Sequence, residues 1–195
     1  MICLRACLFV LLVAASLLLA TSCFSTREPN PPAAASDWTP PNQPDILIAN
    51  FSTAVTTLNV VNYERCFSKA SYSFYPDPTV ARNNQGIFAA WGLQTSEVEY
   101  IRNLARLKDN AGGNRLAFAS PRTNNLSADS LEYIADYELT LYQADTAYRN
   151  YNFKGTINLY LIRNAYNEWA IAAWRDTRTT PTLCWSQLKE KFVGR

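Results

Sequence analysis

Residues 131–141 read LEYIADYELTL and residues 151–161 read YNFKGTINLYL, and these two stretches decide the fold. In both, apolar or aromatic side chains occupy every second position, while charged or amide side chains occupy most positions between them. Because the side chains of a strand point alternately to its two faces, each stretch predicts a strand with one buried and one solvated face. We expect two long antiparallel strands here.

The same alternation continues on both sides of this pair. Residues 116–119 alternate in the same way, and residues 168–176, EWAIAAWRD, predict the last strand. Residues 164–167, NAYN, are rich in turn-forming asparagine and separate that strand from the one before it. The second half of the chain is therefore predicted to be a meander of strands.

Helical spacing dominates the first half. Residues 44–61 begin with Pro-Asp and repeat apolar side chains at helical intervals, and residues 62–68 predict a second, short helix. Two prolines then favour an extended piece at residues 72–75. Residues 96–107 begin with an S-x-x-E capping box and continue with apolar residues at intervals of three, which predicts a third helix. A last helix, residues 185–192, is expected on the edge of the sheet.

This order of elements predicts an α+β domain, with N-terminal helices packed on one face of a curved antiparallel sheet. The helix order, the paired long strands and the terminal WAIAAWRD with a tryptophan-led helix after it resemble the NTF2-like superfamily, with its SnoaL-like and ketosteroid isomerase-like members. The resemblance covers residues 44–192. It implies a cone-shaped domain that encloses a pocket between sheet and helices.

The first 22 residues have the features of a bacterial secretion leader. Arg5 is the only charge before the largely apolar run 6–20, which is too short to cross a hydrocarbon core of about 30 Å. Residues 19–23, LATSC, resemble the lipobox, although Ala20 stands where Leu is commoner and Ser22 where Gly or Ala is usual. The resemblance implies lipidation of Cys23. The alternative is ordinary cleavage after Ser22.

Acyl chains on Cys23 would hold the mature chain to a membrane, because each buried methylene contributes about 0.8 kcal/mol. By resemblance to known lipoproteins, Phe24 in place of Asp favours the outer membrane of the cell envelope, with the protein facing the periplasm. Residues 23–44 contain six prolines and few apolar side chains, which predicts an extended tether. The NTF2-like domain is expected at residues 45–195, behind the signal peptide of residues 1–22 and this tether.

Charge and residue types exclude several functions. The leader removes only Arg5 from a net charge of +2, and the mature chain at +1 has no basic stripe for nucleic acid. The chain has no histidine, which excludes Ser-His-Asp and Cys-His nucleophiles and His-rich metal sites. It also has neither a C-x-x-C pair nor a glycine-rich phosphate loop. The sequence therefore predicts no metal site and no cofactor.

Two cysteines, Cys66 and Cys184, remain in the predicted domain. An oxidising compartment would allow a disulfide between them, which would stabilise by roughly 4 to 5 kcal/mol in the chain-entropy model. The alternative is two buried free thiols that pack as small apolar side chains. Both alternatives stay open from the sequence.

Carboxylate and phenol chemistry remains available, and the resemblance associates it with the Asp base and Tyr donor of ketosteroid isomerases. Asp136 and Glu138 lie two residues apart on one strand and therefore on the same face, with Tyr133 nearby. In a partly dry pocket, such a carboxylate would act as a general base. The alternative is a solvated outer face, with cross-strand ion pairs to Lys154.

The aromatic side chains also allow two interpretations. Trp91, Trp169 and Trp174 are expected to fill the space between sheet and helices. Alternatively, these residues and Tyr137 line a cavity for an apolar or amphipathic ligand. The sequence favours a membrane-anchored, non-catalytic module that binds an envelope protein or a small apolar ligand. The second hypothesis is a small isomerase or lyase that uses a carboxylate and a tyrosine.

Overall fold

The computed structural model describes residues 37–108, 113–144, 151–179 and 181–194, which belong to one compact unit beginning at Asp37. The expected leader, Cys23 and most of the expected tether lie outside the described residues. No helix among the described residues has both the length and the hydropathy needed to cross a lipid bilayer.

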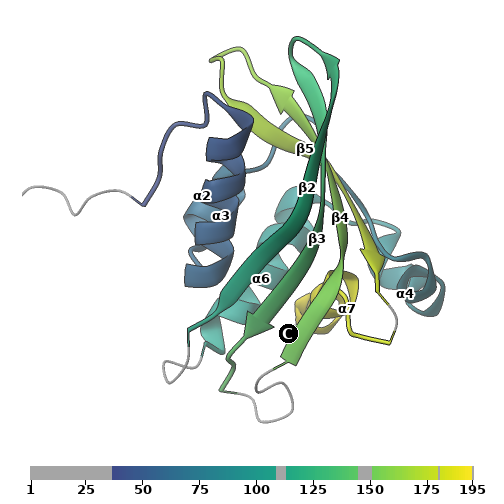
Figure 1. Ribbon diagram of the computed structural model, residues 1–195. Coiled ribbons are helices and arrows are strands. Elements are labelled where there is room, and N and C mark those ends of the chain that lie inside the picture. The colour runs from purple at the N-terminus through teal and green to yellow at the C-terminus, as the bar shows by residue number, and fades with distance from the viewer. Residues whose placement is uncertain (1–36, 109–112, 145–150, 180, 195) are drawn as a thin grey trace, which may run out of the picture. The chain divides into compact units, whose positions relative to one another are not determined.

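The described strands form one twisted five-stranded sheet with the order β1-β5-β4-β3-β2 (Figure 1). Its members are β1 (Ser73–Tyr75), β2 (Arg115–Ser127), β3 (Ser130–Leu141), β4 (Tyr151–Arg163) and β5 (Trp169–Arg178). Strands β2 to β5 pair antiparallel, as predicted. The sheet is nevertheless mixed, because β1 pairs parallel to β5. The extended piece expected at residues 72–75 is thus present as β1, although its parallel pairing with β5 was not predicted.

The two stretches that predicted the fold pair with each other along their whole length. Leu131 lies opposite Leu161 and Leu141 lies opposite Tyr151. Along β3 the odd-numbered residues from Leu131 to Leu141 are buried and the even-numbered residues are half-buried or exposed. The other edge strand, β2, is interrupted by a register shift between Ala119 and Arg122. Such an irregularity, with Pro121 inside it, makes an exposed edge a poor template for another strand.

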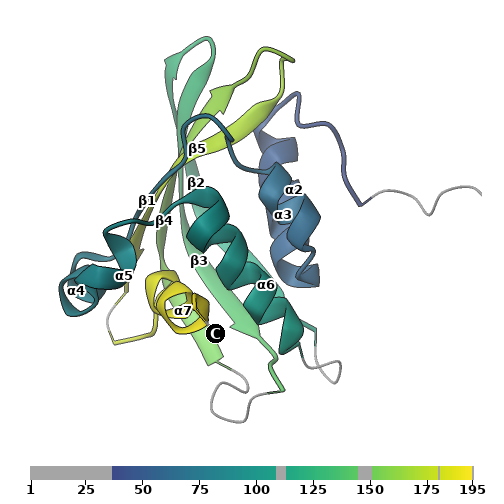
Figure 2. The same cartoon turned by 180° about the vertical axis from the view of Figure 1, so that it is seen from behind.

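The helices α2, α3, α6 and α7 cover one face of the sheet (Figures 1 and 2). Their bounds are α2 (Pro44–Thr57), α3 (Val60–Arg65), α6 (Val98–Arg106) and α7 (Trp185–Phe192), and the π-helical turn η1 (Leu93–Glu97) leads directly into α6. Two short helices that the sequence did not predict, α4 (Pro78–Asn83) and α5 (Gln85–Phe88), follow β1. The α+β architecture with helices on one face is as predicted.

The first predicted helix ends earlier than the apolar pattern indicates. Leu58 has a φ of 54°, and this left-handed residue separates α2 from α3. The side chain of Asn59 then accepts a hydrogen bond from the Asn62 N–H and caps α3. The predicted capping box at Ser96 is wrong, because the helical chain begins at Leu93 and Ser96 lies inside it. The π-helical turn takes the place of the cap.

The C-terminal helix α7 has the predicted bounds but not the predicted position. It packs along α6 and across β4 and β5, in the middle of the covered face instead of at the edge. Trp185 and Phe192 are accordingly buried in the main core. The sequence could indicate an apolar face for α7 but not where that face lies on the sheet.

The last residues of the predicted tether belong to the domain. The carbonyl of Pro41 accepts a hydrogen bond of 2.7 Å from the Trp169 N–H, and Thr39 exchanges two hydrogen bonds with the side chain of Asn50. Trp38 packs against the core cluster. The domain therefore begins at about residue 37 and not at residue 45.

Candidate functional site

Aromatic side chains fill the space between the helices and the sheet. The ring centroids of Trp174 and Trp185 lie 4.7 Å apart, and Phe51 lies within 6 Å of both. Tyr63 and Phe67 pack on the same cluster, with their centroids 4.9 Å apart. All five side chains are buried. In this chain the inner space is therefore largely core.

A carboxylate lies inside this core. Glu97, the last residue of η1, is fully buried and accepts four hydrogen bonds. The Tyr63 hydroxyl donates to Oε1 at 2.5 Å, while the Tyr72 hydroxyl and the Trp91 Nε1 donate to Oε2 at 2.7 and 2.8 Å. The fourth donor is Lys189 Nζ, 2.7 Å from Oε2. A buried carboxylate is tolerated only when it is paired in this way.

Lys189 of α7 is also fully buried, and the rings around it stabilise its charge. Its Nζ lies 3.6 Å from the ring centroids of both Phe74 and Trp174, which is within cation–π range. Burial lowers the pKa of Lys189 to about 8, although the nearby Glu97 acts in the opposite direction. The ion pair and its surrounding rings thus join α7 to η1.

The tyrosines around this pair stay protonated. Burial, and next the negative charge of Glu97, raise the pKa of Tyr63, Tyr72 and Tyr100 well above the usual value. Tyr100 extends the network, since its hydroxyl lies 3.1 Å from the Tyr63 hydroxyl and accepts from Trp185 Nε1. We call Glu97, Lys189, Trp91 and these three tyrosines the inner network. Its groups resemble those of an acid–base site, but both charged members are inaccessible to solvent.

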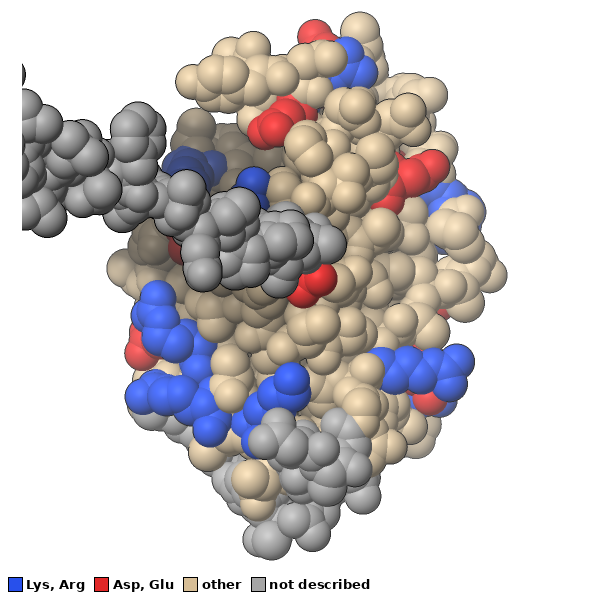
Figure 3. All heavy atoms as spheres, turned by 90° about the vertical axis from the view of Figure 1, so that its left-hand side faces the viewer, with Lys and Arg blue, Asp and Glu red and all other residues tan. Residues whose placement is uncertain are grey.

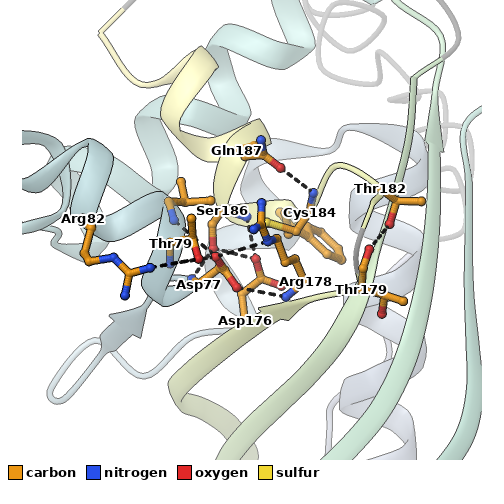
Figure 4. A network of polar contacts seen from close by, with 12 residues as sticks. Asp77, Thr79, Arg82, Asp176, Arg178, Thr179, Thr182, Cys184, Ser186 and Gln187 are labelled. Carbon is orange, nitrogen blue, oxygen red and sulfur yellow. Dashed lines mark hydrogen bonds and ion pairs between the residues drawn. The ribbon is translucent and has the colours of Figure 1, made fainter.

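A second buried network fixes the start of α7 (Figure 4). Asp176 of β5 accepts from the Tyr137 hydroxyl at 2.8 Å and from both the N–H and the Oγ of Ser186, at 2.7 and 2.6 Å. Burial is the main reason that the pKa of Asp176 is raised. Tyr137 also accepts from the Trp185 N–H, and Ser186 Oγ accepts from the Asp77 N–H. These contacts join β5, α4 and α7, which is a structural role.

The carboxylates that the sequence proposed for catalysis lie outside this region. Asp136 and Glu138 are exposed on the uncovered face of β3. Glu138 forms an ion pair of 3.2 Å with Lys154, and Asp136 accepts from the Thr156 hydroxyl. They border a shallow groove on that face. The structure thus has the cross-strand ion pair that the sequence analysis gave as the alternative to a catalytic base.

The predicted phenol partners point the other way. Tyr133 and Tyr137 are buried on the inner face of β3, because they are an odd number of residues away from the two carboxylates. Tyr133 packs edge-to-face on Phe118. The proposed pairing of a carboxylate and a tyrosine on one face is therefore not formed.

The four aromatic residues that the sequence proposed as pocket candidates do not share one environment. Trp91 and Trp174 are buried in the core, as the packing alternative predicted, and Tyr137 is buried in the second network. Trp169 is also mostly buried, but one part of it lines an open groove. Tyr137 also borders the groove beside Asp136 and Glu138, while Trp169 contributes to this open groove.

This groove has a volume of about 450 Å³. We call it the rim groove, because it lies at the end of the sheet where β4 turns into β5. Three segments line it: Trp38 and Pro41 before α2, residues 65–70 from the end of α3 onward, and residues from Ile162 to Ala170 around the β4–β5 turn. In the space-filling view, Lys and Arg side chains lie in a recess in the upper part of the face turned to the viewer (Figure 3).

Backbone hydrogen bonds hold the walls of the rim groove together. Residues Cys66 and Ser68 each bond to Ile171 of β5 at 2.8 Å, and the Trp169 N–H bonds to Pro41. The turn itself is shaped by Asn164, whose side chain accepts from the Tyr166 and Glu168 N–H groups. The predicted turn at residues 164–167 is thus formed and provides one wall.

Cys66 and Cys184 are both buried free thiols, so the alternative with a disulfide is not formed in the structure. Burial raises the pKa of both thiols, that of Cys184 to about 12. The described residues contain no cluster of three or more Cys, Asp and Glu side chains that could hold a metal ion. The lipidation site Cys23 lies outside the described part of the chain.

Sequence reasoning missed Glu97, Lys189 and Trp38. A signal existed for the first two, since Glu97 lies four residues before the buried Ile101, and Lys189 lies between Leu188 and Phe192. Each is thus a charge within an apolar helical stripe. Trp38 is an aromatic residue in a proline-rich segment, and nothing in its neighbours indicated that it packs on the domain.

No protein-family model matches the chain, and no curated protein matches it in sequence. Solved structures do share its fold. A proposed scytalone dehydratase from Novosphingobium aromaticivorans superposes with a TM-score of 0.57 at 8% identity, over 70% of this chain and 81% of that one. An NTF2-like protein of unknown function in nutrient uptake from Rhodospirillum rubrum gives 0.53 at 12%, over 69% and 97%. A proposed aromatic ring hydroxylase from N. aromaticivorans gives 0.52 at 12%, over 70% and 87%. The domain therefore has the NTF2-like fold, which is found in both enzymatic and non-catalytic proteins.

Proposed function

We propose that this protein is a cell-envelope lipoprotein, held to the outer membrane by acyl chains on Cys23, whose NTF2-like domain faces the periplasm as a non-catalytic binding module. The rim groove is its binding site. The observation that supports binding at the rim groove most directly is the inner network: a dry ion pair and aromatic packing occupy the space between helices and sheet, while an open groove of about 450 Å³ lies at the rim.

The anchor rests on the lipobox-like residues 19–23. Its test is membrane association and metabolic palmitate labelling of Cys23→Ser, compared with Cys7→Ser, which changes a leader cysteine outside the lipobox. We expect Cys23→Ser to lose the label and to leave the membrane fraction, while Cys7→Ser keeps both. A Cys23→Ser protein that stays membrane-bound and labelled would refute the anchor.

Binding at the rim groove is favoured over catalysis by the surroundings of the charged groups. Glu97 and Lys189 are sealed in the core, whereas Asp136 and Glu138 are solvated on the opposite face and are partnered by Thr156 and Lys154. The rim groove instead offers aromatic surface in a volume within the usual range of small-ligand sites, about 300–1,000 Å³. This arrangement binds a ligand without providing a general base.

The test is thermal stabilisation of the purified protein by fractions of the envelope: lipids, glycans and proteins. A ligand present at 100 times its Kd stabilises by about 2.7 kcal/mol. Ala165→Trp places an indole in the rim groove and should abolish the stabilisation, while Ala49→Trp on the exposed side of α2 should not. If no fraction stabilises the protein, or if both variants respond like the parent, the groove is not the binding site.

A further inference from the structure

The rim groove combines flat apolar walls with positive charge. Its aromatic side chains are Trp38, Phe67, Tyr166 and Trp169. Tyr166 is 85% exposed, although an aromatic ring of this size is usually at least half covered in a folded domain. A ring held at the mouth of a concavity in this way is suited to stack on a planar or apolar group.

Two cations that form no ion pair within the described part of the chain border the same concavity. Arg65 and Lys69 are exposed, and neither forms an ion pair with another described residue. The Arg65 guanidinium lies 4.2 Å from the ring centroid of Trp38, which fixes its position in the wall. Such a stacked guanidinium keeps its N–H donors for an oxygen ligand.

Two buried N–H donors beside the rim groove also lack an acceptor among the described residues. The Nε1 of Trp169 is buried and has no hydrogen-bond partner among the described residues, and the same is true of Nε of Arg163, whose guanidinium stacks on Trp169 at 4.9 Å. Buried donors normally have an acceptor. Both of these atoms are N–H donors, so the missing partner in each case is a hydrogen-bond acceptor.

From these observations we infer that the rim groove binds a small molecule with a planar apolar body and a carboxylate or phosphate group. The body stacks among Tyr166, Trp169 and Trp38, and the anion lies toward Arg65 and Lys69. This inference rests on the proposed function, because it names the ligand class of the same groove. A volume of about 450 Å³ accommodates a ligand of one or two fused rings.

One carboxylate also lines the groove, so that neutralising it and neutralising a cation should change anion binding in opposite directions. Glu168 is half-buried in the β4–β5 wall and lines the groove. It lowers the positive potential that Arg65 and Lys69 create. Removing its charge should therefore strengthen the binding of an anion, whereas removing either cation should weaken it.

The experiment titrates three probes with the same ring system into the chain from Phe24 to Arg195, which keeps every residue after the proposed lipidation site. The probes are 2-naphthoate, 2-naphthalenemethanol and 2-naphthylmethylamine, with charges of −1, 0 and +1 at pH 7. Isothermal titration calorimetry gives each Kd. We expect naphthoate to bind about 5- to 10-fold more tightly than the alcohol, and the amine to bind most weakly.

Substitutions then assign the effect to the groove. Lys69→Gln and Arg65→Gln should each weaken naphthoate binding about 2- to 5-fold and leave the alcohol unchanged, while Glu168→Gln should strengthen it by a similar factor. Arg102→Gln, on the exposed side of α6, is the matched control and should have no effect.

The outcomes separate this inference from the proposed function. If all three probes bind equally and Ala165→Trp abolishes their binding, the groove is a binding site but the anionic ligand class is wrong. If no probe binds at millimolar concentration, the ligand class is also overturned, while stabilisation by envelope fractions still tests the groove. If neutralising Glu168 weakens naphthoate binding, charge is not what selects the ligand.

Discussion

Replacing Glu97 by Gln should strongly destabilise the domain, because it breaks a buried ion pair without removing its partner. The variant leaves the Lys189 charge inside the core, 3.6 Å from two ring centroids. Its amide N–H₂ also takes the place of an oxygen that accepted hydrogen bonds, so at least one of the four donors to Glu97 loses its acceptor. Breaking a buried pair in this way costs about 3–5 kcal/mol. For a domain of this size, about 1 kcal/mol corresponds to 2–4 °C in Tm, so we expect the Tm to fall by roughly 6–20 °C.

A double-mutant cycle makes this prediction sharper. Lys189→Met removes the cation and keeps the length of the stem, and the double variant Glu97→Gln/Lys189→Met has no buried charge at all. We expect it to lose at least about 2 kcal/mol less than the sum of the single variants, because neither partner is left unpaired. Chemical and thermal unfolding, followed by tryptophan fluorescence and circular dichroism, give the four free energies of unfolding.

The control is Glu99→Gln, the same substitution two residues away at a half-exposed position of α6, which should stay within about 0.5 kcal/mol of the parent. If Glu97→Gln behaves like this control and the cycle is additive, water reaches the pair. That result would refute the reasoning that the inner network is sealed, and it would reopen the catalytic alternative for the space between helices and sheet.

Gly155→Ala should cost about 2–4 kcal/mol in chemical unfolding, because the added Cβ would lie 2.8 Å from the Tyr137 hydroxyl and displace it, whereas Gly86→Ala has open space and should be neutral; equal effects would contradict this. The tyrosines Tyr63, Tyr72, Tyr100 and Tyr137 have raised pKa values, so the stability that they confer is present below pH 10 and lost as the pH rises above it, by up to about 5 kcal/mol per pH unit. The lowered pKa of Lys189 acts in the opposite direction between about pH 8 and 10.5, and a stability that does not fall between pH 10.5 and 11 would show that the tyrosines are solvated. In the chain from Phe24 onward, Cys66 and Cys184 should resist alkylation at pH 8 in the native state and react fully after unfolding without reductant; failure to react after unfolding would indicate a disulfide.

The regular part of the fold was predictable because its pattern is local. Residues 131–141 and 151–161 alternate at most positions, and the strand predicted at residues 168–176 is β5, Trp169–Arg178. What could not be predicted depends on partners far along the chain. The strand β1 has only three residues, and its parallel pairing with β5 is set by contacts across about 100 positions. The left-handed conformation of Leu58 could not be predicted from the sequence either, because leucine has no preference for that conformation.

The candidate site was less predictable than the fold for a related reason. A strand pattern assigns residues to two faces but does not say which face is covered, so Asp136 and Glu138 could be read either as pocket residues or as surface residues. The helices decide, since they cover the odd-numbered face of β3. Glu97 and Lys189, by contrast, follow the apolar stripes of two separate helices, and only the packing of α7 along α6 and η1 brings their charges together.

The use of the inner space explains why the rim groove is where binding is expected. This fold is also found in enzymes, but here its interior is filled by contacts that stabilise the domain. The ion pair, the four raised tyrosine pKa values and the aromatic cluster all depend on the exclusion of water. Opening that space for a substrate would expose the pair and would cost several kcal/mol, a large fraction of the stability of an ordinary domain. Binding at the rim avoids this cost, because Trp38 and the β4–β5 turn are already partly solvated. Since one wall is formed by the residues that directly precede α2, a chain shortened to Pro44 would keep the inner network and lose part of the groove, which separates the stability of this domain from its proposed function.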